Sequence, residues 1–206
     1  SFIESNKYYE SLETFRKSMA LKGFEYVTEY DQAITNYFDN RIRYRKYVQQ
    51  ERLKYGCNPY QDNAFISTID NQPLPFTILN GNPGYINYLD AINSFLLVSE
   101  IHRVTSFTAA ASFKHTAPAG VGIALNGFTK EEVEMFGIGK FSLSLSSSGR
   151  AYTRARNCDP LSSFGDFVAI SGIVDVQCAK LIKREVCDGI IAFGYLDEAL
   201  EILKEK

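Results

Sequence analysis

The sequence predicts an α/β protein in which a layered domain follows a purely helical segment. From residue 64 onward, short apolar runs bounded by Gly, Pro and Asn alternate with longer amphipathic patterns, which is typical of layered α/β domains. Before that point only helical periodicity occurs. With 206 residues, of which 45% are hydrophobic and 14% aromatic, the chain can bury a sizeable core.

The helical segment is expected to contain two helices. The first is predicted over 6–22, because apolar residues recur at steps of four, three and four at Tyr8, Leu12, Phe15 and Met19. The second is predicted over 29–48, with an apolar face that begins at Tyr30. The charged end of this pattern is interpreted as a helix that runs into a linker.

The layered part is expected to begin after the loop-forming residues Gly56, Asn58 and Pro59. Thr129 followed by Glu132 is a capping-box pattern and predicts a helix start. The expected strands cover 64–69, 74–79, 107–113, 166–171 and 189–194. The expected helices cover 84–104, 129–136, 146–156, 175–187 and 196–205.

Composition argues against several classes of partner. The formal net charge is −2, so no overall positive field attracts nucleic acid or a membrane surface. No apolar stretch reaches the roughly 20 residues that span a bilayer. The four cysteines (Cys57, Cys158, Cys178 and Cys187) form no CxxC pair, and no signal-like N-terminus is found. We therefore expect a cytoplasmic protein with free thiols and no metal site.

The residues that first suggest chemistry are Lys114 and His115, at the end of the predicted strand 107–113. Loops that leave strand ends are the usual place for ligand sites in α/β sheets. A neutral imidazole is a good general base near pH 7, and a neighbouring ammonium can stabilise a developing oxyanion. The pair suits the attack of a weak amine on a carbonyl carbon. The alternative is that Lys114 extends into water and His115 only caps a turn.

The second histidine is given no chemical role. His102 lies near the end of the predicted helix 84–104, where it suits the helix dipole. Three further junctions, at 53–61, 162–167 and 187–191, each combine a glycine with polar or charged residues. Glycine lets the backbone approach a ligand closely, because it has no Cβ.

Five motifs, which include these junctions, occur in the following order along the chain: "LKYGCNPYQ", "ILNGNPGYIN", "AASFKHTAPAGVG", "ARNCDPLSSFGDFVA" and "REVCDGIIAFGY". Together they resemble the AICAR transformylase region of the bifunctional purine-biosynthesis family that joins AICAR formyltransferase to IMP cyclohydrolase. The stretch 12–38 is similar to the last helices of the cyclohydrolase domain. The resemblance implies that residues 1–52 are those helices and a linker. It implies that residues 53–206 are the first, cytidine-deaminase-like half of the transformylase domain, a three-layer α/β/α subdomain.

The resemblance also implies a reaction. The 5-amino group of AICAR attacks the formyl carbon of 10-formyltetrahydrofolate, and the products are FAICAR and tetrahydrofolate. His115 corresponds to the base that takes the amine proton, and Lys114 to the residue that stabilises the transition state. The implied substrate-binding residues are Lys54, Tyr55, Asn87, Phe164, Gly165 and Asp188.

Two positions depart from the family pattern. Lys54 stands where the family usually has arginine, and a lysine holds a phosphate as a point charge instead of by two fork-like hydrogen bonds. Tyr60 stands where histidine is frequent. The resemblance further implies a chain about three times longer, a homodimer, and a potassium site in the part of that longer chain outside these 206 residues. We therefore expect this chain to be inactive by itself.

There are two alternative interpretations of the function. A zinc deaminase would need an H-x-E triplet and a P-C-x-x-C pair, and the sequence contains neither. A non-catalytic structural or nucleotide-binding remnant of the same domain is the main alternative. Binding of AICAR at a site containing Lys114, His115 and Asp188 separates an assembly remnant from a substrate-binding domain.

Overall fold

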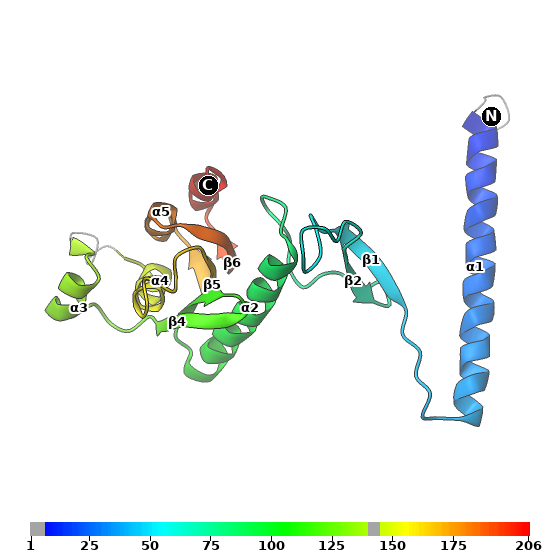
Figure 1. Cartoon of the computed structure of the whole chain (residues 1–206), viewed down its shortest axis with the longest axis horizontal. Coiled ribbons are helices and arrows are strands. Elements are labelled where there is room, and N and C mark those ends of the chain that lie inside the picture. The colour runs from blue at the N-terminus through cyan, green and yellow to red at the C-terminus, as the bar shows by residue number, and fades with distance from the viewer. Residues whose placement is uncertain (1–6, 140–144) are drawn as a thin grey trace. The chain divides into compact units, whose positions relative to one another are not determined.

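The computed structural model describes residues 7–139 and 145–206 (Figure 1). The chain divides into two compact units. One comprises the residues up to Gln49 together with Ser67–Leu74. The other comprises Gln50–Ile66 together with Pro75–Lys206, and it contains all the candidate site residues.

The N-terminal segment forms one helix, α1 (Lys7–Phe38), so the prediction of two helices over 6–22 and 29–48 was wrong. No proline interrupts residues 22–29, and the single Gly23 costs only about 1 kcal/mol in a helix interior. The helix ends where Asp39 offers a local alternative, since its Oδ1 accepts hydrogen bonds from the Arg41 backbone N–H (3.0 Å) and Nε (2.9 Å).

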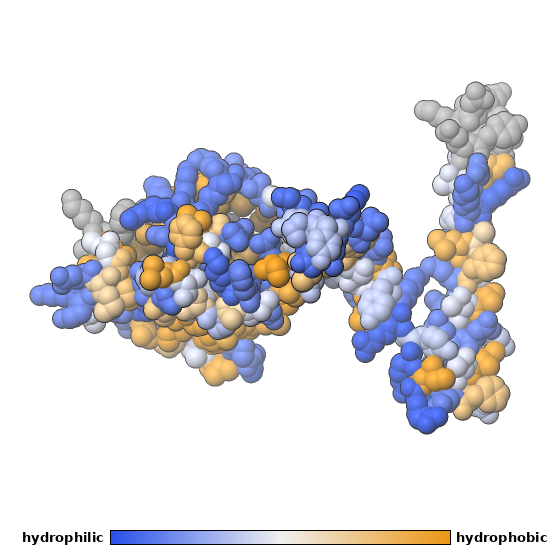
Figure 2. Space-filling view, viewed as in Figure 1, coloured by the Kyte–Doolittle hydropathy of each residue, from blue (hydrophilic) through white to orange (hydrophobic). Residues whose placement is uncertain are grey.

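Apolar and aromatic side chains are exposed along α1, where Figure 2 shows orange, hydrophobic patches among blue ones. The exposed fraction reaches 74% for Phe24 and 85% for Tyr37. A helix with its apolar side chains exposed gains little from burial, so α1 depends on its own backbone hydrogen bonds within this chain.

Strands β1 (Tyr47–Arg52) and β2 (Phe65–Ile69) pair as a two-stranded sheet. The strand predicted over 64–69 is thus confirmed, while β1 replaces the expected end of the second helix. The strand predicted over 74–79 is wrong, because this segment has no strand secondary structure. Pro75 has no N–H to give to a ladder, and a β-like pattern without a neighbouring strand forms no sheet.

The second unit follows the predicted order with one addition, the strand β4. The elements after β2 are α2 (Tyr85–Thr105), β3 (Ala109–Lys114), β4 (Ala117–Ile123), α3 (Lys130–Met135), α4 (Ser147–Asn157), β5 (Asp166–Val174), α5 (Val176–Arg184), β6 (Cys187–Tyr195) and α6 (Asp197–Lys204). The predicted helix over 175–187 ends early, because β6 already begins at Cys187.

The sheet is mixed and has the strand order β4-β3-β5-β6. Strand β3 runs antiparallel to β4 and β5, whereas β5 and β6 are parallel. Hydrophobic clusters cover both faces. The cluster on one face joins α2 to the sheet through Ala91, Val98, Ala109, Ala111, Phe113, Phe167 and Ala169. The cluster on the other face joins α4, α5 and α6 to the sheet through Ala110, Ala151, Ala155, Val168, Ile170, Cys178, Ile182, Ala199 and Leu203. The predicted α/β class is confirmed.

Strand β4 was missed because its sequence, APAGVGI, is rich in residues that disfavour strands. The structure shows why glycine is needed here. A Cβ on Gly120 would lie 2.1 Å from the Ala155 carbonyl oxygen, and one on Gly122 would lie 2.6 Å from that of Ala151. Both contacts are with α4, so the glycines let this helix pack directly against the strand backbone.

We predict that Gly120→Ala destabilises the fold by about 1–3 kcal/mol or more, since the backbone of α4 cannot move away without disturbing the core. The measurement is the free energy of unfolding in urea. Gly194→Ala is the matched control on β6, where the nearest neighbour of the new methyl is Ile173 Cγ1 at 3.8 Å. Equal losses in the two variants would contradict the close packing of β4 against α4.

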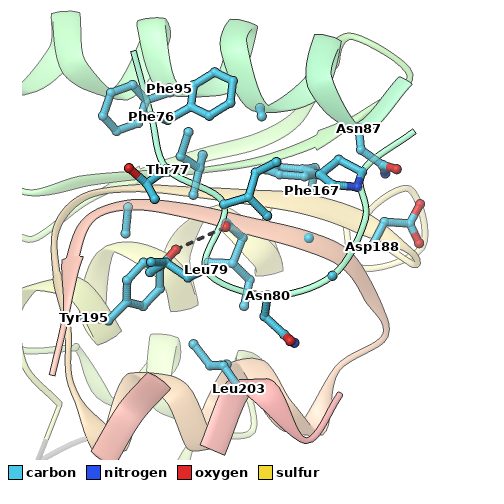
Figure 3. Close-up of a pocket in the computed structure, with 18 of the residues that line it drawn as sticks. Phe76, Thr77, Leu79, Asn80, Asn87, Phe95, Phe167, Asp188, Tyr195 and Leu203 are labelled. Atoms are coloured by element: carbon cyan, nitrogen blue, oxygen red, sulfur yellow. Dashed lines mark hydrogen bonds between the residues drawn. The ribbon is translucent and has the colours of Figure 1, made fainter. Parts of the chain in front are cut away.

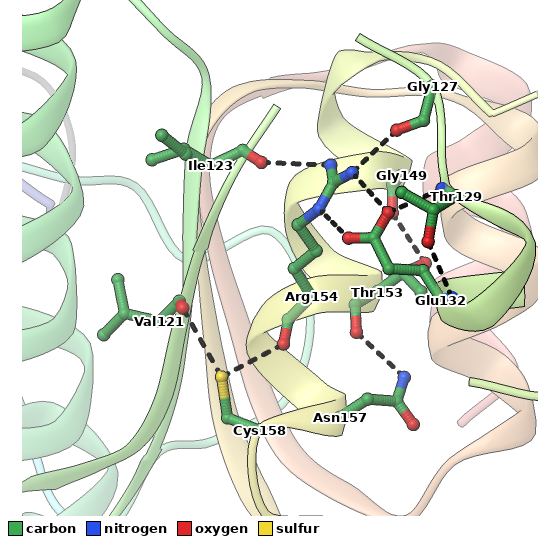
Figure 4. A network of polar contacts seen from close by, with 10 residues as sticks. All are labelled: Val121, Ile123, Gly127, Thr129, Glu132, Gly149, Thr153, Arg154, Asn157 and Cys158. Atoms are coloured by element: carbon green, nitrogen blue, oxygen red, sulfur yellow. Dashed lines mark hydrogen bonds and ion pairs between the residues drawn. The ribbon is translucent and has the colours of Figure 1, made fainter. Parts of the chain in front are cut away.

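A network of hydrogen bonds and an ion pair links α3 to α4 (Figure 4). The predicted capping box is confirmed, since Thr129 Oγ1 accepts from the Glu132 N–H (3.1 Å) and Glu132 Oε2 accepts from the Thr129 N–H (2.8 Å). The Arg154 guanidinium donates to Glu132 Oε1 (3.0 Å) and to the Gly127 carbonyl (2.6 Å), and it stacks over the ring of Phe128. The hydrogen bonds from Arg154, and then from the Thr129 backbone, lower the pKa of the Glu132 carboxyl.

A carboxyl with a lowered pKa in the folded state stabilises the fold above its usual pKa of about 4.3. Below that value the unfolded chain binds more protons, so the contribution is lost as the pH falls through the folded-state pKa. We predict that Glu132→Gln costs about 1 kcal/mol at pH 7 and progressively less below pH ~4. Urea unfolding across this pH range is the measurement. The control is Glu134→Gln on the exposed side of α3, and a loss for Glu132→Gln that does not vary with pH would contradict the assignment.

Candidate active site at the β3–β4 turn

The site begins with a two-residue hairpin turn. Lys114 pairs with Ala117 across the β3–β4 ladder, so His115 and Thr116 alone make the turn. Both have positive φ, 52° and 70°, as in type I′ turns, which normally select Asn-Gly or Gly-Gly. For a β-branched residue such as Thr116 this conformation is an outlier, and each such residue costs about 1–3 kcal/mol. Strained backbone of this kind is concentrated at functional sites.

The Lys114 ammonium lies beside the loop that precedes β5. Its Nζ makes a short contact with the Phe164 carbonyl oxygen. The next residue, Gly165, has φ +72° and donates its N–H to the Val186 carbonyl (3.0 Å). A methyl group on Gly165 would lie 3.0 Å from Lys114 Nζ and 3.9 Å from Asp188 Oδ1. Glycine therefore both permits the backbone angle and leaves space between the ammonium and the carboxylate.

The sheet register explains why these residues meet. Phe113 pairs with Phe167 across the antiparallel β3–β5 ladder, and Asp166 pairs with Cys187 across the parallel β5–β6 ladder. The carboxyl end of β3 consequently meets the amino ends of β5 and β6. Sequence reasoning treated the 162–167 and 187–191 junctions as loops at strand ends like the Lys114 loop. The structure instead places 162–167 at the start of β5 and 187–191 in the first half of β6, because β3 runs opposite to β5.

An apolar groove of about 800 Å³ begins at the same edge of the sheet (Figure 3). Its walls are formed by α2, β6, α6 and residues 75–83. Asn87 and Asp188 both line one end of it, and Phe167 lies nearby (Figure 3). A volume of this size suits a small organic ligand.

Asn87 also has a structural task. Its Oδ1 accepts the Gly84 N–H (3.0 Å) and so closes the N-terminus of α2. The amide Nδ2 is a separate donor and makes no hydrogen bond among the described residues. Asn87 can thus cap the helix and present an N–H to a ligand at once.

Among the described residues, the other side chains predicted from the sequence form no hydrogen bond or ion pair with Lys114 or His115. Lys54 and Tyr55 lie in the loop after β1, where Lys54 Nζ is 6.0 Å from the ring centroid of Tyr55. In the part of the chain that the structure describes, no hydrogen bond or ion pair joins this loop to Lys114 or His115. The Phe164 side chain is 61% exposed and Tyr60 is 80% exposed. His102, to which no chemical role was assigned, lies in the last turn of α2 with its Nδ1 2.9 Å from the Phe107 carbonyl oxygen.

Two buried carboxylates near the turn were not anticipated. Asp166 is fully buried, and its Oδ2 lies 2.5 Å from Ser112 Oγ, while burial raises the pKa of its carboxyl. Asp90, which is 5% exposed on α2, accepts the Thr116 N–H at 2.5 Å. A polar residue within an otherwise apolar stretch was the available signal for both, namely Asp166 before "FVAIS" and Asp90 within "YLDAI".

The arrangement combines an ammonium, an exposed imidazole, a nearby carboxylate and a concave apolar surface. Such a set can hold a polar small molecule, move a proton and stabilise negative charge. The fold and the site therefore define an α/β domain with a candidate small-molecule active site at one edge of its sheet. Among the described residues, no group of three or more His, Cys, Asp and Glu side chains is arranged to hold a metal ion. None of the described helices has the length and hydropathy needed to cross a bilayer.

The chain belongs to the AICARFT/IMPCHase bienzyme family, whose model matches residues 2–206. This confirms the resemblance drawn from the five motifs. Relatives named bifunctional purine biosynthesis protein PurH are each 32% identical to it, in Staphylococcus epidermidis, Staphylococcus carnosus strain TM300 and Clostridium botulinum strain Hall. The alignments cover 99%, 94% and 93% of this chain. They cover 35%, 33% and 35% of the relatives, so the chain spans about a third of their length.

Proposed function

We propose that this chain provides the catalytic pair for transfer of a formyl group from 10-formyltetrahydrofolate to AICAR in purine biosynthesis. The AICAR amine nitrogen bonds to the formyl carbon, and the bond between that carbon and the folate N10 breaks. His115 accepts the proton that the amine loses, and N10 gains a proton as it leaves. The products are FAICAR and tetrahydrofolate. Lys114 stabilises the oxyanion that forms on the formyl oxygen.

The observation that supports this assignment most is the space beside Gly165. The Lys114 ammonium and the Asp188 carboxylate both border the point where a Gly165 side chain would be, at 3.0 and 3.9 Å, and Lys114 Nζ contacts the Phe164 carbonyl oxygen instead of this carboxylate. Asp188 lines the end of the groove, whereas Lys114 lies outside the groove lining, on the other side of the Gly165 position. A cation and an anion held apart in this way suit a ligand that carries both acceptors and donors. In this proposal Asp188 binds the nucleotide, the Gly165 backbone contacts it, and Phe164 lines the folate side.

The proposal also covers the remaining candidate residues and the longer protein to which they would belong. Asn87 would lie near the reacting groups, and Lys54 and Tyr55 would contact the nucleotide. We further propose that residues 53–206 are a cytidine-deaminase-like half of the transformylase domain and that residues 1–52 belong to the cyclohydrolase side. A homodimer and a potassium site in a longer protein are parts of the same proposal, as is IMP cyclohydrolase activity outside these residues.

The first test is AICAR binding to the 206-residue chain, measured by calorimetry. We expect Asp188→Ala and Lys114→Ala to weaken binding about tenfold each, because each removes one charged contact with the nucleotide, equivalent to about 1.4 kcal/mol. Gly165→Ala should weaken it similarly, since its methyl group occupies the space between the two charges.

Matched controls separate binding from folding. Gly127 has a positive φ of 55°, like Gly165, but a methyl group on it would meet nothing within 4 Å and the residue does not line the groove, so Gly127→Ala is the matched control. Asp197→Ala and Lys180→Ala change exposed charges on α6 and α5. If the chain binds no AICAR, or if the controls weaken binding as much as the site variants do, the chain is the non-catalytic remnant and the proposed site is wrong.

The second test concerns turnover. We expect the purified chain to transfer no formyl group by itself, because it spans a third of its relatives. A chimera in which residues 1–206 replace the matched third of the Staphylococcus epidermidis relative should produce tetrahydrofolate, and His115→Ala should lower its kcat at least 100-fold. Rapid transfer by the isolated chain, or a fully active His115→Ala chimera, would contradict the proposal.

A further inference from the structure

The imidazole of His115 has no side-chain partner to orient it. It is exposed, and within the described residues it makes no hydrogen bond. A side chain in this situation is placed only by the backbone that carries it. The backbone in question is the two-residue turn with positive φ at both His115 and Thr116, a conformation that neither residue prefers.

One contact compensates for this conformation. The Thr116 N–H donates to Asp90 Oδ1 at 2.5 Å, and the Asp90 side chain is almost completely buried. A hydrogen bond from an amide to a carboxylate is about twice as strong as one between neutral groups. Asp90 lies in the second turn of α2, whose Ala91 and Val98 pack into the cluster with Phe113 of β3. The carboxylate is therefore attached to a rigid element, while the turn that it holds would otherwise be supported only by its two strands.

We infer that Asp90 is a positioning residue for the reaction, which it serves by holding the β3–β4 turn in the left-handed conformation that presents His115. This inference rests on the proposed function of His115 but concerns a residue that neither the five motifs nor the groove assigned. Asp90 acts through the backbone of Thr116 and does not contact substrate. Loss of the acceptor should release the turn toward ordinary φ angles and move the imidazole away from Lys114.

The first measurement needs only this chain. NMR scalar couplings and ¹³C chemical shifts report φ at His115 and Thr116 in the labelled 206-residue protein. We expect Asp90→Ala to lose the positive φ at both residues. Asp90→Asn keeps an oxygen that can accept the Thr116 N–H, and should keep the turn.

Asp175→Ala is the matched control, because Asp175 Oδ1 accepts the Cys178 N–H (2.8 Å) at the start of α5 in the same kind of contact. It should lower stability without changing the turn. His102, the second histidine, reports whether α2 has stayed intact through its contact with Phe107. Positive φ retained in Asp90→Ala would overturn the inference.

The second measurement is kinetic and uses the chimera. Asp90→Ala should lower kcat at least tenfold while KM for AICAR stays within about twofold, and Asp90→Asn should recover most of the rate. If Asp90→Ala is fully active while His115→Ala is inactive, the positioning role is wrong and the proposed function stands. If His115→Ala is also fully active, the proposed function itself has failed, whatever the turn does.

Discussion

The register of the mixed sheet is the constraint on which the site depends. Because β3 is antiparallel to β5 and β5 is parallel to β6, one edge of the sheet collects the end of β3 and the beginnings of the other two strands. Lys114, Gly165 and Asp188 are far apart in sequence and adjacent only through these two ladders. A shift of one residue in either ladder would turn the corresponding side chains to the opposite face. The apolar clusters on both faces oppose such a shift.

The same edge concentrates features that would be unfavourable elsewhere. Two non-glycine residues adopt left-handed backbone angles in the turn, a lysine ammonium lies against a carbonyl oxygen, and Asp90 and Asp166 are buried nearby. Each has a local compensation, such as the Thr116 N–H for Asp90 and the Ser112 hydroxyl for Asp166. A surface used only for packing would not need this set, whereas a site that must hold separated charges does.

Local patterns were sufficient to predict much of the fold. The capping box at Thr129, the helix that became α2 and the strand ending at Lys114 all depend on residues close in sequence. Predictions failed where distant contacts decide. Gly120 belongs to a strand because α4 packs on it, and residues 74–79 form no strand because no neighbour pairs with them. For the site, the sequence pointed to Lys114 and His115 as candidates because of their residue types and their place at the end of a predicted strand. The left-handed turn was not predictable from the sequence. The apolar surroundings of Asp90 marked it as unusual, but a hydrogen bond between residues 26 apart leaves no periodic signal that links it to Thr116.

The most direct measurement of the central claim is a crystal structure of the chain with AICAR bound. The account predicts the nucleotide at the sheet edge beside Gly165, with Lys114 Nζ and the Asp188 carboxylate both within hydrogen-bonding distance of it and the imidazole of His115 facing its amino group. A nucleotide bound elsewhere on the domain, with Lys114 still against the Phe164 carbonyl and Asp188 in contact only with solvent, would contradict it.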